Sequence, residues 1–166
     1  GDKIVHSKNG LLSTVAWQIG DKIDYALEGS IFVSGSLMKW LRDQMQLFEN
    51  TKETQAMAES VENTNGVYIV PAFVGLGAPY WDDACQASIL GLSFGANKNH
   101  IVRAALESMA YQSKDVLDAM KQDSQINISS LKVDGGAAAN DFLLQFQSDL
   151  LQMPVQRFKT NELTAL

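Results

Sequence analysis

The segment LKVDGGAAANDFLLQFQSDLL, residues 131–151, joins an apolar run to an amphipathic stretch through two glycines. The apolar run is typical of a strand, and the stretch from Asn140 to Leu150 predicts a helix. A strand that passes through Gly135 and Gly136 into a helix presents backbone N–H groups at the carboxyl end of a sheet. The helix N-terminus there attracts an anion. This junction favours an α/β fold with a ligand site at its edge.

The Gly-Gly junction allows two interpretations. In a nucleotide-phosphate loop, glycines let backbone and ligand approach closely, three alanines keep the entrance open, and Asn140 donates its amide to a phosphate. In a plain strand-to-helix turn, Asn140 or Asp141 caps the helix. The local sequence leaves both open. The chain contains no G-x-x-x-x-G-K-[ST], and VGLGAPYW lacks the third glycine of the dinucleotide fingerprint.

The rest of the chain alternates between β-rich and helical patterns. Two β-rich runs around Gly20-Asp21 predict an antiparallel hairpin, and two more strands, 129–136 and 153–158, flank the helix already described. Further helices are predicted at 31–48, 51–61 and 100–120, the last capped by Asn99, and further strands at 66–73 and 87–95. This order predicts an α/β domain, a mixed sheet flanked by helices, with antiparallel strands first and parallel strands later.

Composition narrows the function classes. The chain has 166 residues, 46% of them hydrophobic and 19% charged, which is typical of a globular domain. A net charge of −6 without a Lys/Arg patch argues against a nucleic-acid partner. No apolar run approaches the ~20 residues that span a bilayer. Cys85 is the single cysteine and cannot form an internal disulfide, which favours a reducing, cytoplasmic setting.

The two ends predict a truncated fragment of a longer chain. The first residue is glycine, and the last seven residues, TNELTAL, have the pattern of a helix start, with Asn161 as its cap. We expect residues 1–166 to form one domain whose exposed strand edge and apolar face make it a homo-oligomer.

Several longer runs, taken in order, resemble one family. They are YALEGSIFVSGSLMKWLRDQM, NTNGVYIVPAFVGLGAPYWD, ASILGLSFGANKNHIVRAALESMAYQ and VDGGAAANDFLLQFQSDLL. Together they resemble the C-terminal half of the glycerol kinases, in the FGGY carbohydrate kinase family, over nearly the whole chain. Residues 87–107 fit the C-terminal signature of that family through Gly91-Leu92, His100-Ile101 and Leu106-Glu107.

The resemblance implies a ribonuclease H-like, actin-like ATPase fold of two domains with ATP between them, of which 1–166 is the nucleotide-side, C-terminal domain. It implies transfer of the γ-phosphoryl group of ATP to glycerol, with Mg²⁺. Carried over by motif, Gly136 and Asn140 meet the nucleotide phosphates and the adjoining sugar region. Gly35 and Lys39 lie near the nucleotide as well.

The family's catalytic carboxylate, first phosphate loop and glycerol-binding residues lie upstream of this segment. The resemblance therefore implies ATP or ADP as a partner, no catalytic residue in this chain and no kinase activity of the chain alone. A noncatalytic actin-like ATP-binding module and an interaction-only domain are the alternatives, and an upstream acidic motif would distinguish a kinase from both.

Several positions keep two interpretations. Gly35 lies in a helical pattern, where glycine destabilises a helix by ~1 kcal/mol relative to alanine. Its presence is explained either by a close ligand contact or by helix–helix packing. Lys39 stands where the family usually has glutamine, and it either pairs with a phosphate or points to water. Residues 83–87, DACQA, replace the family's usual PYARG, which puts any role of this loop in doubt.

The remaining candidate side chains have structural explanations. Asp82 and Asp83 are a candidate Mg²⁺ site, but adjacent loop acids are more often solvated. His100 is interpreted as a first-turn helix residue, because no metal-ligand spacing accompanies it. Cys85 has no neighbouring base in the sequence that would activate it. Asp134 is expected to orient the Gly-Gly turn.

Overall fold

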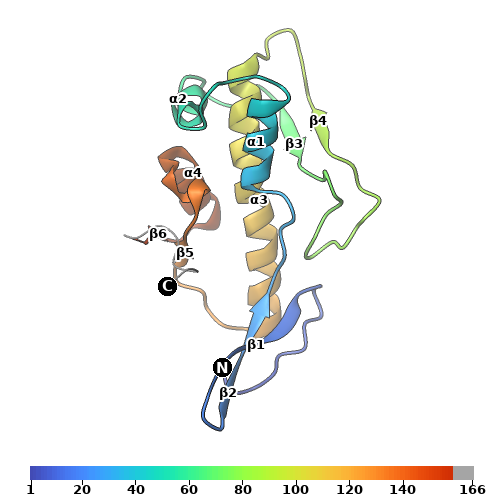
Figure 1. The fold of residues 1–166 in the computed structure, drawn as a ribbon, viewed down its shortest axis with the longest axis vertical. Coiled ribbons are helices and arrows are strands. Elements are labelled where there is room, and N and C mark those ends of the chain that lie inside the picture. The colour runs from blue at the N-terminus through green and yellow to red at the C-terminus, as the bar shows by residue number, and fades with distance from the viewer. Residues whose placement is uncertain (159–166) are drawn as a thin grey trace.

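The computed structural model describes residues 1–158, so the predicted helix start in TNELTAL lies outside the described residues. One long helix, α3 (Lys98–Ser124), forms the axis of the molecule, and the other elements are arranged along it (Figure 1). The shorter helices are α1 (Gly35–Asp43), α2 (Glu53–Glu59), the 3-10 turn η1 (Gly136–Ala139) and α4 (Asp141–Leu151). The strands are β1 (Leu12–Ile19), β2 (Lys22–Glu28), β3 (Tyr68–Val70), β4 (Ser88–Leu90), β5 (Leu131–Val133) and β6 (Val155–Arg157).

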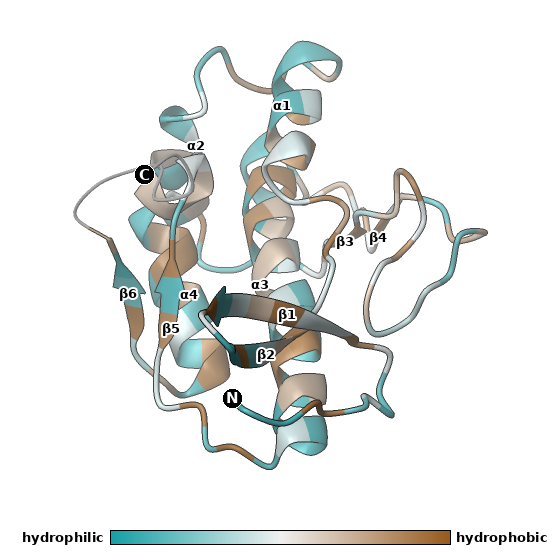
Figure 2. Ribbon diagram, turned by 60° about the horizontal axis from the view of Figure 1, so that its bottom comes forward, coloured by the Kyte–Doolittle hydropathy of each residue, from teal (hydrophilic) through white to brown (hydrophobic). Residues whose placement is uncertain are grey.

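The strands form three separate two-stranded sheets within the described residues. The β1–β2 hairpin and the β3–β4 pair are antiparallel, whereas β5 and β6 are parallel. The predicted α/β class and the order of antiparallel before parallel strands are therefore confirmed. The strands form separate pairs in place of one continuous mixed sheet, with β3 packed on α3 and β6 on α4. Figure 2 shows β5 and β6 beside α4.

The core lies where α1, α3 and α4 meet. Leu41 and Val102 are fully buried there, and Leu143 of α4 packs against the same cluster. A second cluster joins the hairpin to the C-terminal half of α3 through Leu11 and Val116. The long helix thus carries the hairpin at its C-terminal end and α1 and α2 toward its N-terminal end, with α4 beside its middle (Figure 1).

The prediction that α3 begins after Asn99 was wrong. The side-chain oxygen of Asn97 accepts hydrogen bonds from the backbone N–H groups of Asn99 (2.9 Å) and His100. Nδ1 of His100 accepts the Asn97 backbone N–H in return (3.1 Å), which completes a capping box. His100 is therefore a first-turn residue, as predicted. At its other end α3 continues past Met120, because residues 121–124 contain no helix breaker.

The helix predicted at 31–48 is shorter, covering only Gly35–Asp43. Phe48 is 6% exposed, but it reaches the core from a turn in which Gln46 has a φ of 53°. The residues after Asp43 are irregular, but their apolar side chains have the spacing of a helix, which explains why the predicted helix was too long. Gly35 is consequently the first residue of α1, and the expected cost of a mid-helix glycine does not apply.

Among residues 1–158, no helix is both long enough and apolar enough to cross a membrane.

Candidate functional site

A cavity of about 460 Å³ opens where the Gly-Gly turn faces the N-termini of α1 and α2. Its lining combines apolar and polar residues, which suits a small ligand with a flat ring and polar substituents. The apolar side chains are those of Met38, Leu106, Met109 and Leu143. The rest of the lining consists of Gly35, Thr51, Lys52, Thr54, Gln55, Gly136, Ala137, Ala139 and Asn140.

The Gly-Gly turn leaves space on the cavity side. Gly135 has a φ of +87°, which favours glycine, and its N–H donates to the Asp134 carboxylate (2.7 Å). Asp134 therefore orients the turn, as predicted. A Cβ built at Gly136 would meet no atom within 4 Å. A ligand can thus approach the backbone of Gly136 closely.

Asn140 follows this turn and caps α4. Its Oδ1 accepts the backbone N–H of Leu143 (3.0 Å), and its Nδ2 donates to Oγ1 of Thr54 (3.2 Å). The helix-cap interpretation is therefore correct for Asn140. The same residue also lines the cavity, so capping and ligand contact are not alternatives at this position.

Gly35 reaches the cavity from the opposite side. A Cβ at this position would meet nothing within 4 Å, so helix–helix packing does not explain the glycine. The start of α1 instead presents unobstructed backbone to the cavity.

Lys39 is the predicted site residue that does not line the cavity. It is exposed on α1 and is not among the lining residues. The hydrogen bond from Arg42 is the main cause that lowers the pKa of Asp43, and the charge of Lys39 adds to it. Lys52 lines the cavity and was missed by the sequence analysis. No local pattern connects Lys52 with the Gly-Gly turn, because the two segments are distant in the chain.

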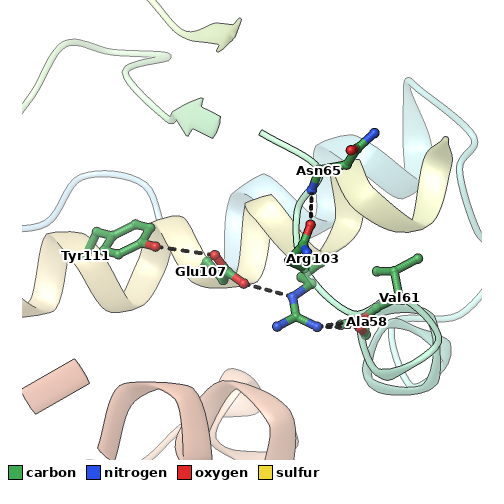
Figure 3. A network of polar contacts seen from close by, with 7 residues as sticks. Ala58, Val61, Asn65, Arg103, Glu107 and Tyr111 are labelled. Atoms are coloured by element: carbon green, nitrogen blue, oxygen red, sulfur yellow. Dashed lines mark hydrogen bonds and ion pairs between the residues drawn. The ribbon is translucent and has the colours of Figure 1, made fainter. Parts of the chain in front are cut away.

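A partly buried polar network on α3 reaches the segment at the end of α2 (Figure 3). Arg103 forms an ion pair with Glu107 (2.9 Å) and donates to the carbonyl oxygen of Val61 (2.6 Å), just after α2. Its guanidinium also lies over the ring of Phe142 in α4, 4.9 Å from the centroid. Tyr111 donates to Glu107, and burial together with that carboxylate raises the pKa of the Tyr111 hydroxyl. The network therefore fixes α2 and α4 relative to each other.

Of the paired acids Asp82 and Asp83, Asp82 has a structural role. Oδ1 of Asp82 accepts the backbone N–H groups of Ala84 and Cys85, each at 3.0 Å, and so shapes the loop. Cys85 is a free, half-buried thiol. Residues 1–158 contain no group of three or more His, Cys, Asp or Glu side chains that could hold a metal ion.

Comparison with known proteins identifies the class to which this fold and cavity belong. The family model described as "FGGY family of carbohydrate kinases, C-terminal domain" matches residues 2–166. The chain belongs to the FGGY family of carbohydrate kinases, and the match is to the C-terminal domain of that family.

The relatives narrow the comparison further. The chain is 58% identical to a glycerol kinase of Alkaliphilus oremlandii and 56% identical to that of Bacillus subtilis, over 166 residues in each case. Each alignment covers 100% of this chain but 33% and 34% of the relative, respectively. The chain therefore spans about a third of the length of these relatives. The resemblance to glycerol kinases that the sequence motifs predicted is confirmed.

Solved structures confirm the predicted fold. A crystal structure of Plasmodium falciparum glycerol kinase with ADP superposes with a TM-score of 0.91 at 39% identity, covering 99% of this chain and 33% of that one. A xylulose kinase from Lactobacillus acidophilus superposes with a TM-score of 0.78 at 21% identity, covering 92% of this chain and 30% of that one. At the lower identity the likeness shows the fold alone.

Proposed function

We propose that this chain is the nucleotide-side domain of a glycerol kinase, an enzyme that transfers the γ-phosphoryl group of ATP to glycerol. The observation that carries the proposal is the cavity beside Gly35 and Gly136, two glycines at which a side chain would have filled open space. Identities of 56–58% with glycerol kinases over the full length of the chain support the choice of substrate.

ATP and ADP fit the chemistry of the lining. The backbone at Gly136 and the amide of Asn140 would meet phosphate and sugar oxygens, while the apolar side chains of the lining would receive the flat base. Gly35 would let the nucleotide pass close to the start of α1. The Plasmodium falciparum glycerol kinase was solved with ADP, which supports a nucleotide as the ligand.

The two lysines take different positions in this proposal. Lys52 lies on the cavity wall, so its ammonium group would contact the nucleotide directly. Lys39 projects from the exposed part of α1 and would act on the nucleotide from the cavity margin. Mg²⁺ in kinases usually binds through substrate phosphates and one or two carboxylates, so we propose that it enters with ATP.

Phosphoryl transfer requires positioning and charge stabilisation on both sides of the reacting groups. We propose that glycerol binds mainly to the other domain of the full-length enzyme, which works in the cytoplasm. The 166-residue chain alone is then expected to phosphorylate glycerol at a negligible rate, well below the ~1–100 s⁻¹ of ordinary kinases. A coupled assay of glycerol 3-phosphate formation measures this.

A titration with ATP tests the nucleotide site. Gly136 has no left-handed φ, so Gly136→Val should preserve the fold while its side chain fills the phosphate space. We expect Gly136→Val to abolish binding and Gly136→Ala to weaken it. Ala84→Val adds comparable bulk on an exposed loop outside the cavity and should bind ATP as the unsubstituted chain does. Unchanged ATP binding by Gly136→Val would exclude this turn as the nucleotide site.

A further inference from the structure

Four groups beside the cavity form a chain of hydrogen bonds that all donate in the same direction. The backbone N–H of Leu143 donates to Oδ1 of Asn140, and Nδ2 of Asn140 donates to Oγ1 of Thr54. The Thr54 hydroxyl in turn donates to the carbonyl oxygen of Thr51 (2.7 Å). Donors and acceptors alternate along this chain, so each bond reinforces the next.

This polarity determines how the Asn140 amide is oriented. A backbone N–H can only be met by an acceptor, so Oδ1 faces Leu143 and Nδ2 faces Thr54. The Thr54 hydroxyl proton is directed at Thr51, which leaves its oxygen lone pairs to accept from Asn140. Among the described residues, this is the side-chain bond that Nδ2 makes. One of its two N–H groups is therefore left for a ligand.

Thr54 is well placed to hold the amide in the orientation that the Leu143 N–H sets. Its side chain belongs to a residue only 2% exposed, and it lines the cavity together with Asn140. The neighbouring Gln55 strengthens the same junction, because its Oε1 accepts the backbone N–H of Asp141 (2.9 Å). The first turns of α2 and α4 are thus joined by two hydrogen bonds.

We propose that Thr54 is a positioning residue that holds the Asn140 amide, whose orientation the Leu143 N–H sets, so that its second N–H is presented to the bound nucleotide. This inference rests on the proposed function. The group that Asn140 meets is accordingly a hydrogen-bond acceptor: a phosphate oxygen, a ribose oxygen or a ring nitrogen of the base.

The test compares ATP affinity in a double-mutant cycle of the 166-residue chain. Thr54→Val keeps the shape of the side chain but removes the hydroxyl, and we expect it to weaken ATP binding roughly three- to tenfold. Thr54→Ser keeps the hydroxyl and should bind within about twofold of the unsubstituted chain. In an Asn140→Ala background, Thr54→Val should change affinity by less than about twofold, because no amide remains to be positioned.

Thr64→Val is the matched control, since Thr64 is also buried (7% exposed) but lies outside the cavity. It should leave ATP affinity unchanged. Three results would overturn the proposal. They are an equal loss of ATP affinity from Thr54→Val with and without Asn140, weak ATP binding by Thr54→Ser, and an equal loss of affinity from Thr64→Val.

The failure of this inference is distinguishable from failure of the proposed function. If Gly136→Val abolishes ATP binding while Thr54→Val does not weaken it, only the role of Thr54 is wrong. If the unsubstituted chain does not bind ATP, the nucleotide site is wrong, and proton exchange of the Asn140 side-chain amide then tests only the role of Thr54 in holding that amide. Faster exchange in Thr54→Val than in Thr54→Ser supports the role, and equal exchange overturns it.

Discussion

Arg103 and Glu107 form an ion pair within α3 that is almost withdrawn from water, with their side chains 16% and 8% exposed. Removing one member of a buried pair leaves the other charge uncompensated. We expect Glu107→Ala to lower the free energy of unfolding by about 3–5 kcal/mol, measured by urea denaturation.

Lys114 and Asp118 form a second pair with the same spacing in the same helix, but their side chains are 39% and 40% exposed. Asp118→Ala is therefore the matched control, with an expected loss of about 0.3–0.5 kcal/mol. Equal losses from Glu107→Ala and Asp118→Ala would mean that the Glu107 contacts do not stabilise the fold.

Gly91 of the family signature faces the backbone of Gly66. It has a φ of +75°, and a Cβ at this position would lie 1.9 Å from the Gly66 carbonyl oxygen. Gly91→Ala should therefore be more destabilising than Gly135→Ala, since Gly135 has a φ of +87° but open space around it. Backbone strain alone predicts about 1–2 kcal/mol for Gly135→Ala in urea denaturation. Equal losses of unfolding free energy from the two variants would show that the β3–β4 region shifts to accommodate the added methyl group.

Asp123 ties the N-terminal segment to the end of α3. Its carboxylate accepts from the Ser7 hydroxyl, the Lys8 backbone N–H (3.0 Å) and the Asn9 side chain (2.7 Å). These hydrogen bonds, led by Ser7, hold the pKa of Asp123 below its ordinary value of 3.8. The contribution to stability is thus complete above that value and is lost as the pH falls through the lower folded-state pKa.

Hydrogen exchange of the Lys8 amide measures this pH dependence. We expect protection near neutral pH that decreases on acidification below the ordinary Asp pKa. Asp123→Asn should reduce protection at neutral pH and remove the acid-dependent step. A step that persists in Asp123→Asn would assign the titration to another group.

The β1–β2 hairpin exposes apolar side chains along a two-stranded sheet. Val15, Trp17 and Ile19 are 54%, 58% and 75% exposed. Unpaired strand edges and apolar patches favour association, so we predict that the chain forms a dimer. Sedimentation velocity over a concentration series measures this, and Val15→Lys should shift the equilibrium to monomer. A single monomeric species at ~100 µM, well above micromolar dissociation constants, would contradict the prediction.

Local features of the fold could be predicted because they depend on neighbouring residues. The turn at Gly135, the cap at Asn140 and the first-turn role of His100 each follow from side chains within a few positions. The choice of Asn97 over Asn99 was not evident, because both can cap a helix and the reciprocal bond from His100 decides between them. The sequence analysis also missed contacts between residues that are far apart in the chain.

The cavity wall illustrates why non-local features escape sequence reasoning. Thr54 and Lys52 join the site only because α2 packs beside α4, an arrangement held by Arg103 and by the Thr54–Asn140 hydrogen bond. No periodicity in either segment encodes that contact. Phe48 shows the opposite error, a predicted feature that the structure lacks. Its apolar side chain extended the predicted helix, although the residue enters the core from a turn.

The central claim is that the cavity between the Gly-Gly turn and the N-termini of α1 and α2 binds the nucleotide. The most direct test is a titration of the ¹⁵N-labelled chain with ATP, followed by the chemical shifts of the backbone amides. The account predicts saturable shifts that are largest at Gly35, Gly136 and Asn140. A second cavity, of about 370 Å³ beside Tyr80 and Asp115, provides the internal comparison. Largest shifts there, or no saturable shift at Gly136, would contradict the account.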